Sequence, residues 1–228
     1  NEFLNIGVDA AALGMSNAVT AQTSDVNSGY WNPAGILQLE EKQIALMHAN
    51  YFANIAQYDY AGFAMPIDDR SAWGLSLIRF GVDDILNTTE LIDSEGNIDY
   101  NRISLFSTAD YGVTFSYARK LPLEGFNYGV NAKVIRRIIG DFASSWGFGF
   151  DVGLQFQNKN DWKFGLMLRD ITTTYNTWTI NEEEYEKIKN AVPGENQELP
   201  ETSEITLPKA QFGISKKFEF HYDYTLTT

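Results

Sequence analysis

The residues from Trp146 to Phe156 alternate strictly between large apolar side chains and small or polar ones. One set is Trp146, Phe148, Phe150, Val152, Leu154 and Phe156, and the other is Gly147, Gly149, Asp151, Gly153 and Gln155. Only an extended strand places successive side chains on opposite faces. The same period returns at 111–118, 126–134 and 162–169. These segments predict an all-β chain.

The nature of the second face favours one kind of β protein. A soluble sandwich also alternates, with its large residues inside, but glycine and small residues weaken strands on a solvent face. They suit the crowded or water-filled lumen of a barrel. Tyr111, Trp146 and Trp162 lie near strand ends, where transmembrane barrels carry aromatic girdles. We therefore predict a transmembrane antiparallel β-barrel with its bulky face toward lipid.

Composition permits this reading and excludes others. The chain holds no run of about 20 apolar residues, which a transmembrane helix needs, whereas a barrel strand needs only about 10 alternating ones. Without cysteine it can form neither disulfides nor thiolate metal sites. A net charge of −13 argues against nucleic acid and against docking on anionic lipid headgroups.

The lengths of the links support a barrel over a sandwich. We expect strands at 42–50, 55–66, 71–80, 108–120, 126–138, 145–157, 161–171 and 207–217, with a ninth starting near 219. Short turns at 66–70, 122–125, 158–160 and 216–217 alternate with longer links at 81–107, 139–144 and 172–206. Transmembrane barrels have short periplasmic turns and longer extracellular loops, so 81–107 and 172–206 are predicted to be extracellular. A break in alternation near 61–62 predicts a bulge or a rim position.

The two ends of the chain differ from the middle. Residues 1–40 are rich in Ala, Gly, Ser, Thr and Asn and lack a strand period, which predicts a luminal hatch or plug ahead of a barrel at 41–228. Barrels usually have an even number of strands, and about nine are expected here. The last residues, 226–228, also lack a terminal aromatic. We expect the barrel to be incomplete and to continue beyond Thr228.

Several motifs resemble the FadL-like superfamily of outer-membrane barrels. They are the stretch 12–18 (Ala-Leu-Gly-Met-Ser-Asn-Ala) and the stretch 30–35, which contains Trp31, Asn32, Pro33, Ala34 and Gly35. Segments 77–85 and 132–135 are most similar to its PorV/PorQ branch. The resemblance spans essentially the whole chain, and the compact motif is Trp-Asn-Pro-Ala-Gly. Proline pushes Asn32 out of the helical region, so the motif is either hatch or a tight turn into the barrel.

The resemblance implies a FadL-type barrel of about 14 strands when complete, with a luminal hatch. It also implies the outer membrane of a Gram-negative bacterium, multi-pass, and a role in type IX protein secretion. The implied partners are outer-membrane lipid and either a large translocon barrel and attachment complex or the C-terminal domains of secreted cargo. The alternative is a FadL-like transporter of hydrophobic small molecules.

Two further groups of residues are candidates for function. Lys133, Arg137, Asp151 and Arg169 fall on the predicted luminal face, where they either line a passage or pair with the hatch. Residues 181–190 predict a helix, with an acidic start and later basic residues that suit its dipole. Its Glu182, Glu183, Tyr185 and Lys187 form either a solvated surface or a docking site for a partner.

No catalytic site is expected. The two histidines, His48 and His221, cannot form a metal cluster, and each is expected at the lumen or an interface. The sequence lacks a nucleophile elbow, a phosphate loop and a dinucleotide fingerprint. We therefore predict a protein that is not an enzyme and that uses no cofactor. No residues of the sequence support the other possibility, a surface enzyme with its active site in the barrel mouth.

Overall fold

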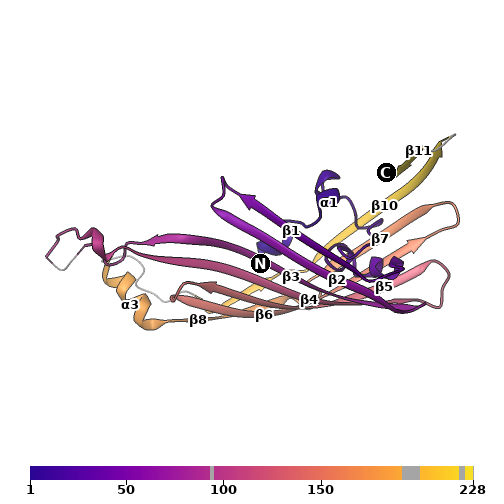
Figure 1. The fold of residues 1–228 in the computed structure, drawn as a ribbon. Helices are drawn as coiled ribbons and strands as arrows, with labels where there is room; N and C mark the ends of the chain where they lie inside the picture. Colours follow the sequence, from indigo (N-terminus) through magenta and orange to yellow (C-terminus); the bar gives the residue numbers. More distant parts are fainter. Residues whose placement is uncertain (93–94, 192–200, 221–223, 228) are drawn as a thin grey trace.

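The computed structural model describes residues 1–92, 95–191, 201–220 and 224–227. Its strands form one antiparallel sheet in which chain neighbours mostly pair, from β1 at one edge to β11 at the other. The strands are β1 (Gln43–Tyr51), β2 (Ala56–Asp68), β3 (Ser71–Asn87), β4 (Ser104–Lys120), β5 (Phe126–Ile139), β6 (Ala143–Gln157), β7 (Trp162–Arg169), β8 (Thr174–Ile180), β9 (Ser203–Thr206), β10 (Lys209–Phe220) and β11 (Tyr224–Thr227). The sheet curls into a partial barrel with a concave face (Figure 1). The all-β prediction is confirmed.

Two strand positions of the sheet are interrupted. Strand β6 pairs with β8 along its first half and with β7 along its second. In the next position, β9 pairs with β8 and β10 pairs with β7. The first interruption contains Asp170 and Thr173, both with positive φ, and the second contains Pro208, which cannot donate to a ladder. The main path of the described sheet therefore passes through nine strands.

The two faces of the sheet differ as the alternation predicts. On the convex face, Phe148 and Phe150 are 59% and 49% exposed, and Phe115 and Phe212 of other strands are exposed as well. On the concave face, Gly147 and Asp151 of the same strand β6 are buried. A sheet that turns its large apolar side chains outward has the polarity of a membrane barrel.

Residues 1–39 fill part of the concave face. They contain η1 (Glu2–Asn5), α1 (Ala10–Gly14), α2 (Ser28–Trp31) and η2 (Pro33–Gln38). One buried cluster joins Phe3, Leu4, Val8 and Trp31 to Tyr58, Tyr60, Ile78 and Ile135 of the sheet. A second joins Val26, Ile36 and Leu39 to Ala64, Ala72 and Ala118. This N-terminal segment, called the hatch below, supplies the apolar core that the sheet lacks.

The links at the two ends of the sheet differ in length. Strands β3 and β4 extend beyond the expected bounds, so the predicted loop 81–107 is reduced to 88–103. The ladder continues to Asn87 and Ser104 past a bulge between Val82 and Ile85. The link predicted at 139–144 is a tight turn at 140–142, and the predicted loop 172–206 contains β8 and β9. All three links still lie at the same end of the sheet, opposite the turn at 121–125 (Figure 1).

Strand β2 is more regular than its sequence predicts. Its register with β3 runs unbroken from Ala56 to Pro66, and the shift comes only between Pro66 and Asp68. The bulge expected near 61–62 is therefore absent. Gly62 faces inward, and the Tyr60 ring covers the space that a side chain there would occupy. The expectation was wrong because a glycine on the inner face of a strand resembles a break in the apolar pattern.

Helix α3 (Glu182–Ala191) lies at the end of the sheet that carries the longer links (Figure 1). Residues 192–200, which complete this link, are outside the described residues. Within the described parts of the chain, no helix has both the length and the apolarity to cross a membrane.

Candidate functional site

The Trp31–Gly35 motif lies buried between the hatch and the wall. The Trp31 indole Nε1 donates to the Val8 carbonyl at 3.1 Å. The Asn32 amide donates to the carbonyls of Thr20 and Leu154, at 3.0 and 3.1 Å, and its Oδ1 accepts from the Ala34 N–H. The backbone of Asn32 is extended, and Pro33 follows at the start of η2. The side chain of Asn32 thus joins two parts of the hatch to β6.

The wall beneath this motif is shaped by glycine. A Cβ at Gly129 would collide with the backbone of Pro33 and Ala34, and one at Gly153 with the Asn32 amide. A Cβ at Gly165 would collide with the backbone of Thr20 and Ala21. The small residues on the inner face therefore allow the hatch backbone to lie directly on the strands at these positions.

Lys133 and Asp151, two of the predicted luminal residues, form a buried ionic cluster with Asp170, which the sequence analysis did not predict. The Lys133 ammonium lies 2.7 Å from Asp151 and 2.6 Å from Asp170. All three side chains are at most 11% exposed. Asp151 also accepts from the Asn131 amide and the Asp170 N–H, and Asp170 accepts from the Thr174 hydroxyl. The cluster holds one cation and two carboxylates, and the hydrogen bonds from Asn131, the Asp170 N–H and Thr174 stabilise the excess negative charge.

Arg169 connects the wall to the hatch. Its guanidinium donates to the Tyr30 carbonyl at 2.9 Å and lies over the Tyr30 ring, 4.7 Å from the centroid. Nearby, the Asn131 amide donates to the Gly29 carbonyl at 2.9 Å. Since Asn131 also bonds Asp151, the ionic cluster and the hatch share one hydrogen-bond network. Arg169 thus bonds the hatch directly, and Asp151 is connected to it through Asn131.

Arg137 belongs to a separate group, nearer the end with the longer links. It pairs with Asp110 and Glu204, both at 2.9 Å, and lies over the Trp178 ring. Asn1 lies beside this group, because its side chain donates to Thr206 and accepts from Asn176. The four predicted luminal residues are thus divided between an ionic cluster, a hatch contact and this rim group.

The four residues of α3 are also divided. Glu182 and Glu183 are exposed. Tyr185 lines an apolar cavity of about 320 Å³ together with Ile139, Phe142, Ala143, Trp178, Ile180 and Glu201. Lys187 pairs with Glu184 at 2.7 Å, and this hydrogen bond raises the pKa of the Lys187 ammonium. Of these four residues, Glu182 and Glu183 are therefore the two most accessible to a partner.

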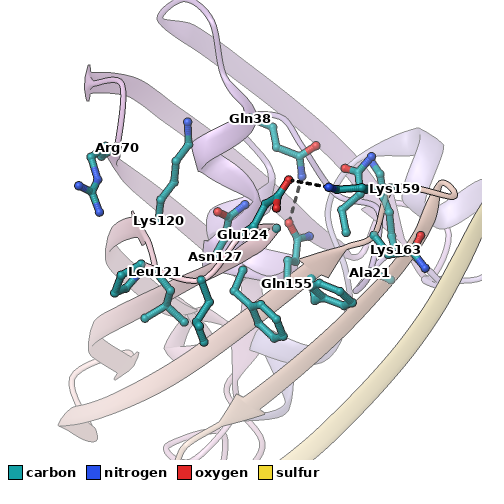
Figure 2. A pocket seen from close by; sticks show the side chains of 17 residues that line it. Ala21, Gln38, Arg70, Lys120, Leu121, Glu124, Asn127, Gln155, Lys159 and Lys163 are labelled. Atoms are coloured by element: carbon teal, nitrogen blue, oxygen red, sulfur yellow. Dashed lines mark hydrogen bonds and ion pairs between the residues drawn. The ribbon is translucent and has the colours of Figure 1, made fainter.

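A second cavity, of about 790 Å³, lies at the opposite end of the sheet (Figure 2). It is lined by the turns β4–β5 and β6–β7 and by Ala21 and Gln38 of the hatch. Four cationic residues line it, namely Arg70, Lys120, Lys159 and Lys163. The sequence analysis did not predict this site, because its cations lie on four segments that only the fold brings together.

No candidate metal-binding cluster is present in the parts of the chain that the structure describes. They hold no group of three or more His, Asp or Glu side chains placed to bind a metal ion. His48 lies on the convex face and pairs with Asp59 at 2.6 Å. His221 lies outside the described residues.

The fold is similar to that of a solved outer-membrane protein. A crystal structure of a Pseudomonas aeruginosa FadL homologue matches with a TM-score of 0.52 and 12% sequence identity. The match covers 96% of this chain and 67% of that one. No family model and no curated protein matches the sequence. At this identity the likeness concerns the fold, and it confirms the predicted FadL-type antiparallel β architecture without extending to the PorV/PorQ branch.

Proposed function

We propose that the chain is an outer-membrane β-barrel component of the type IX protein secretion system that works by binding other proteins. The observation that carries this proposal is the close packing of the hatch on the inner face. The hatch backbone contacts Gly129 and Gly165 of the strands, and Arg169, Asn131 and Asn32 bond it to the wall. A hatch bonded in this way obstructs passage along the wall, which favours a role through the ends of the barrel. The similarity of segments 77–85 and 132–135 to the PorV/PorQ branch supports the secretion role.

The convex face supports a membrane location. Leu46, Phe148 and Phe212 are 79%, 59% and 68% exposed, on three different strands. Large apolar patches are rare on soluble monomers, and they are the rule on the lipid face of a barrel. The first partner is therefore the lipid of a Gram-negative outer membrane.

The end with α3 is the proposed docking surface for the secretion partners. Glu182 and Glu183 are exposed there, on a helix whose Tyr185 lines a cavity with Trp178 of the neighbouring strand β8. The candidates are a large translocon barrel, the attachment complex or a cargo C-terminal domain. Acidic residues on a raised helix suit a basic patch on such a partner.

A pull-down from native outer membrane, read by mass spectrometry, tests this role. The tagged chain is expected to retain a large translocon barrel or a cargo C-terminal domain. Glu182→Lys with Glu183→Lys should reduce that recovery at least about tenfold, because like charges then face each other. Glu124→Lys, an exposed change at the other end of the sheet, is the matched control. Recovery of neither partner, or equal loss with the control, contradicts the proposal.

The alternative function is transport of a hydrophobic small molecule, and the apolar cavity beneath α3 favours it. Its Trp178, Ile180 and Tyr185 offer contacts for an apolar ligand at the barrel mouth. A hydrophobic fluorescent probe should bind the chain in detergent. Loss of this binding in Trp178→Ala, but not in the lipid-facing Phe148→Ala, supports transport. Equal binding by both variants removes the case for this cavity.

A further inference from the structure

The cavity between the short turns has the features of a binding site that the secretion role does not use. It holds about 790 Å³, within the range of small-molecule pockets in proteins. Figure 2 shows Arg70 and Lys120 on one side and Lys159 and Lys163 on the other, with Gln38, Glu124 and Gln155 between them. The charged side chains come from several turns and strands, and the hatch forms the inner wall.

The cations of this cavity are largely unneutralised. Lys159 lies 3.5 Å from Glu124, which is the one carboxylate among the lining residues. Arg70, Lys120 and Lys163 form no ion pair with any residue that the structure describes. Lys163 is also half-buried.

Other carboxylates near the cavity lie outside its lining. Glu40, Asp68 and Asp69 line a neighbouring pocket that shares Lys120, and Asp68 accepts from the backbone N–H of Arg70. Asp161 lies two residues before Lys163 in the sequence and forms no ion pair with it. Three unpaired cations in one cavity are unusual in a chain with a net charge of −13. An anion that enters here gains charge-assisted hydrogen bonds without displacing an existing partner.

The rest of the lining is apolar on one side and amide-bearing on the other. Leu121 and Leu123 of the β4–β5 turn line the cavity, and at its edge the rings of Phe126 and Phe156, on the convex side of the strands, stack with centroids 4.3 Å apart. On the hatch side, Gln38 donates to Gln155, whose own amide donates to the Thr23 carbonyl. A ligand for this cavity therefore needs an anionic head and an apolar body.

We propose that this cavity binds a small amphiphile that carries a phosphate group. A phosphomonoester bears nearly two negative charges, so it neutralises more of the three unpaired cations than a monoanion does. The volume of the cavity suits a single small molecule, and the acidic chain as a whole repels an extended anionic surface. The site is independent of the secretion role, since it lies at the opposite end from α3 (Figure 1).

Titration of the full chain in neutral maltoside micelles tests this proposal. The probe is dodecyl phosphate, followed by ³¹P NMR and calorimetry at about pH 8, above its second pKa of about 6. Inorganic phosphate and dodecyl sulfate are run alongside it, because they separate the contributions of the apolar body and of the second charge. We expect saturable binding of dodecyl phosphate that is at least about tenfold tighter than that of either comparison ligand.

Variants then locate the binding. Lys120→Gln and Lys163→Gln should each weaken dodecyl phosphate about tenfold, the loss of one charge-assisted hydrogen bond. Lys42→Gln, which removes the same charge from an exposed lysine outside the cavity, should leave binding unchanged. The exposed Leu123→Ser should weaken dodecyl phosphate and leave inorganic phosphate unaffected.

Four outcomes overturn the proposal. Equal weakening by Lys42→Gln means that the effect is one of overall charge. If dodecyl sulfate binds as tightly as dodecyl phosphate, the site has no preference for phosphate. If inorganic phosphate binds as tightly, the site does not need the apolar body of the ligand. Absence of saturable binding to the parent chain refutes the site.

Discussion

At the scale of single residues, the stability of the chain depends on the buried ion pairs of Lys133. Its ammonium lies between Asp151 and Asp170, and all three groups are buried. A buried charge that loses its partner is far more costly than the pair itself is stabilising. The sequence predicted Lys133 and Asp151 on the inner face, but not Asp170, whose place in the cluster depends on a positive φ at the end of β7.

Removal of the cation should therefore destabilise the chain strongly. Lys133→Met leaves two carboxylates facing each other without a counter-charge, which should lower the free energy of unfolding by about 3–5 kcal/mol. Denaturant unfolding in detergent micelles measures this, with Lys42→Met as the exposed control. Adding Asp151→Asn and Asp170→Asn to Lys133→Met should recover part of the loss. If Lys133→Met unfolds like its control, the cluster is not formed.

Phe150, which precedes Asp151 on β6, lies on the opposite face of the strand and gives a second prediction. Phe150 is 49% exposed on the convex face, so Phe150→Arg should cost about 2–4 kcal/mol if that face meets the bilayer midplane. Because the chain has no cysteine, a single spin label can be placed at 150. Oxygen dissolved in the bilayer should relax this label, whereas a label at the exposed position 124 should respond to a water-soluble nickel reagent. A label at 150 that responds only to the nickel reagent refutes the membrane barrel.

At the scale of elements, local patterns were predictable and contacts between distant segments were not. The alternation around Trp146 gave the strands and their faces, because a strand needs only its own residues to show its period. The interruption between β7 and β8 and the strands inside 172–206 were missed, since they depend on pairing with β6 and β10. Likewise the Trp31–Gly35 motif was visible, but Leu154 of β6, to which Asn32 donates, is 122 residues away in the sequence.

The contact between hatch and wall can be tested at one glycine. In Gly165→Ala the new Cβ would collide with the backbone of Thr20 and Ala21, so the hatch must shift. We expect a loss of about 1–3 kcal/mol in stability and faster proteolysis within residues 1–40. Gly14→Ala is the matched control, because nothing lies within 4 Å of a Cβ there. Equal protease resistance of the two variants contradicts the packed hatch.

At the scale of the whole molecule, the sheet has two unlike ends. Helix α3 and the link 88–103 extend from one end, and short turns with a cationic cavity close the other (Figure 1). The exposed apolar side chains lie on the convex face of the strands between them. In transmembrane barrels the longer loops face the outside and the short turns the periplasm. The prediction for this chain is that α3 is extracellular and the turn 121–125 periplasmic.

This orientation can be tested on intact cells with single cysteines in the cysteine-free chain. Glu183→Cys lies on α3 and Glu124→Cys in the turn 121–125, and both positions are exposed, so neither change disturbs a packed core. A membrane-impermeant maleimide should label position 183 on intact cells and position 124 only after the outer membrane is permeabilised. Phe150→Cys, facing lipid, should resist the reagent in both conditions. Labelling of 124 without 183 on intact cells means that the barrel is inserted the other way round, and labelling of all three positions means that the convex face meets water.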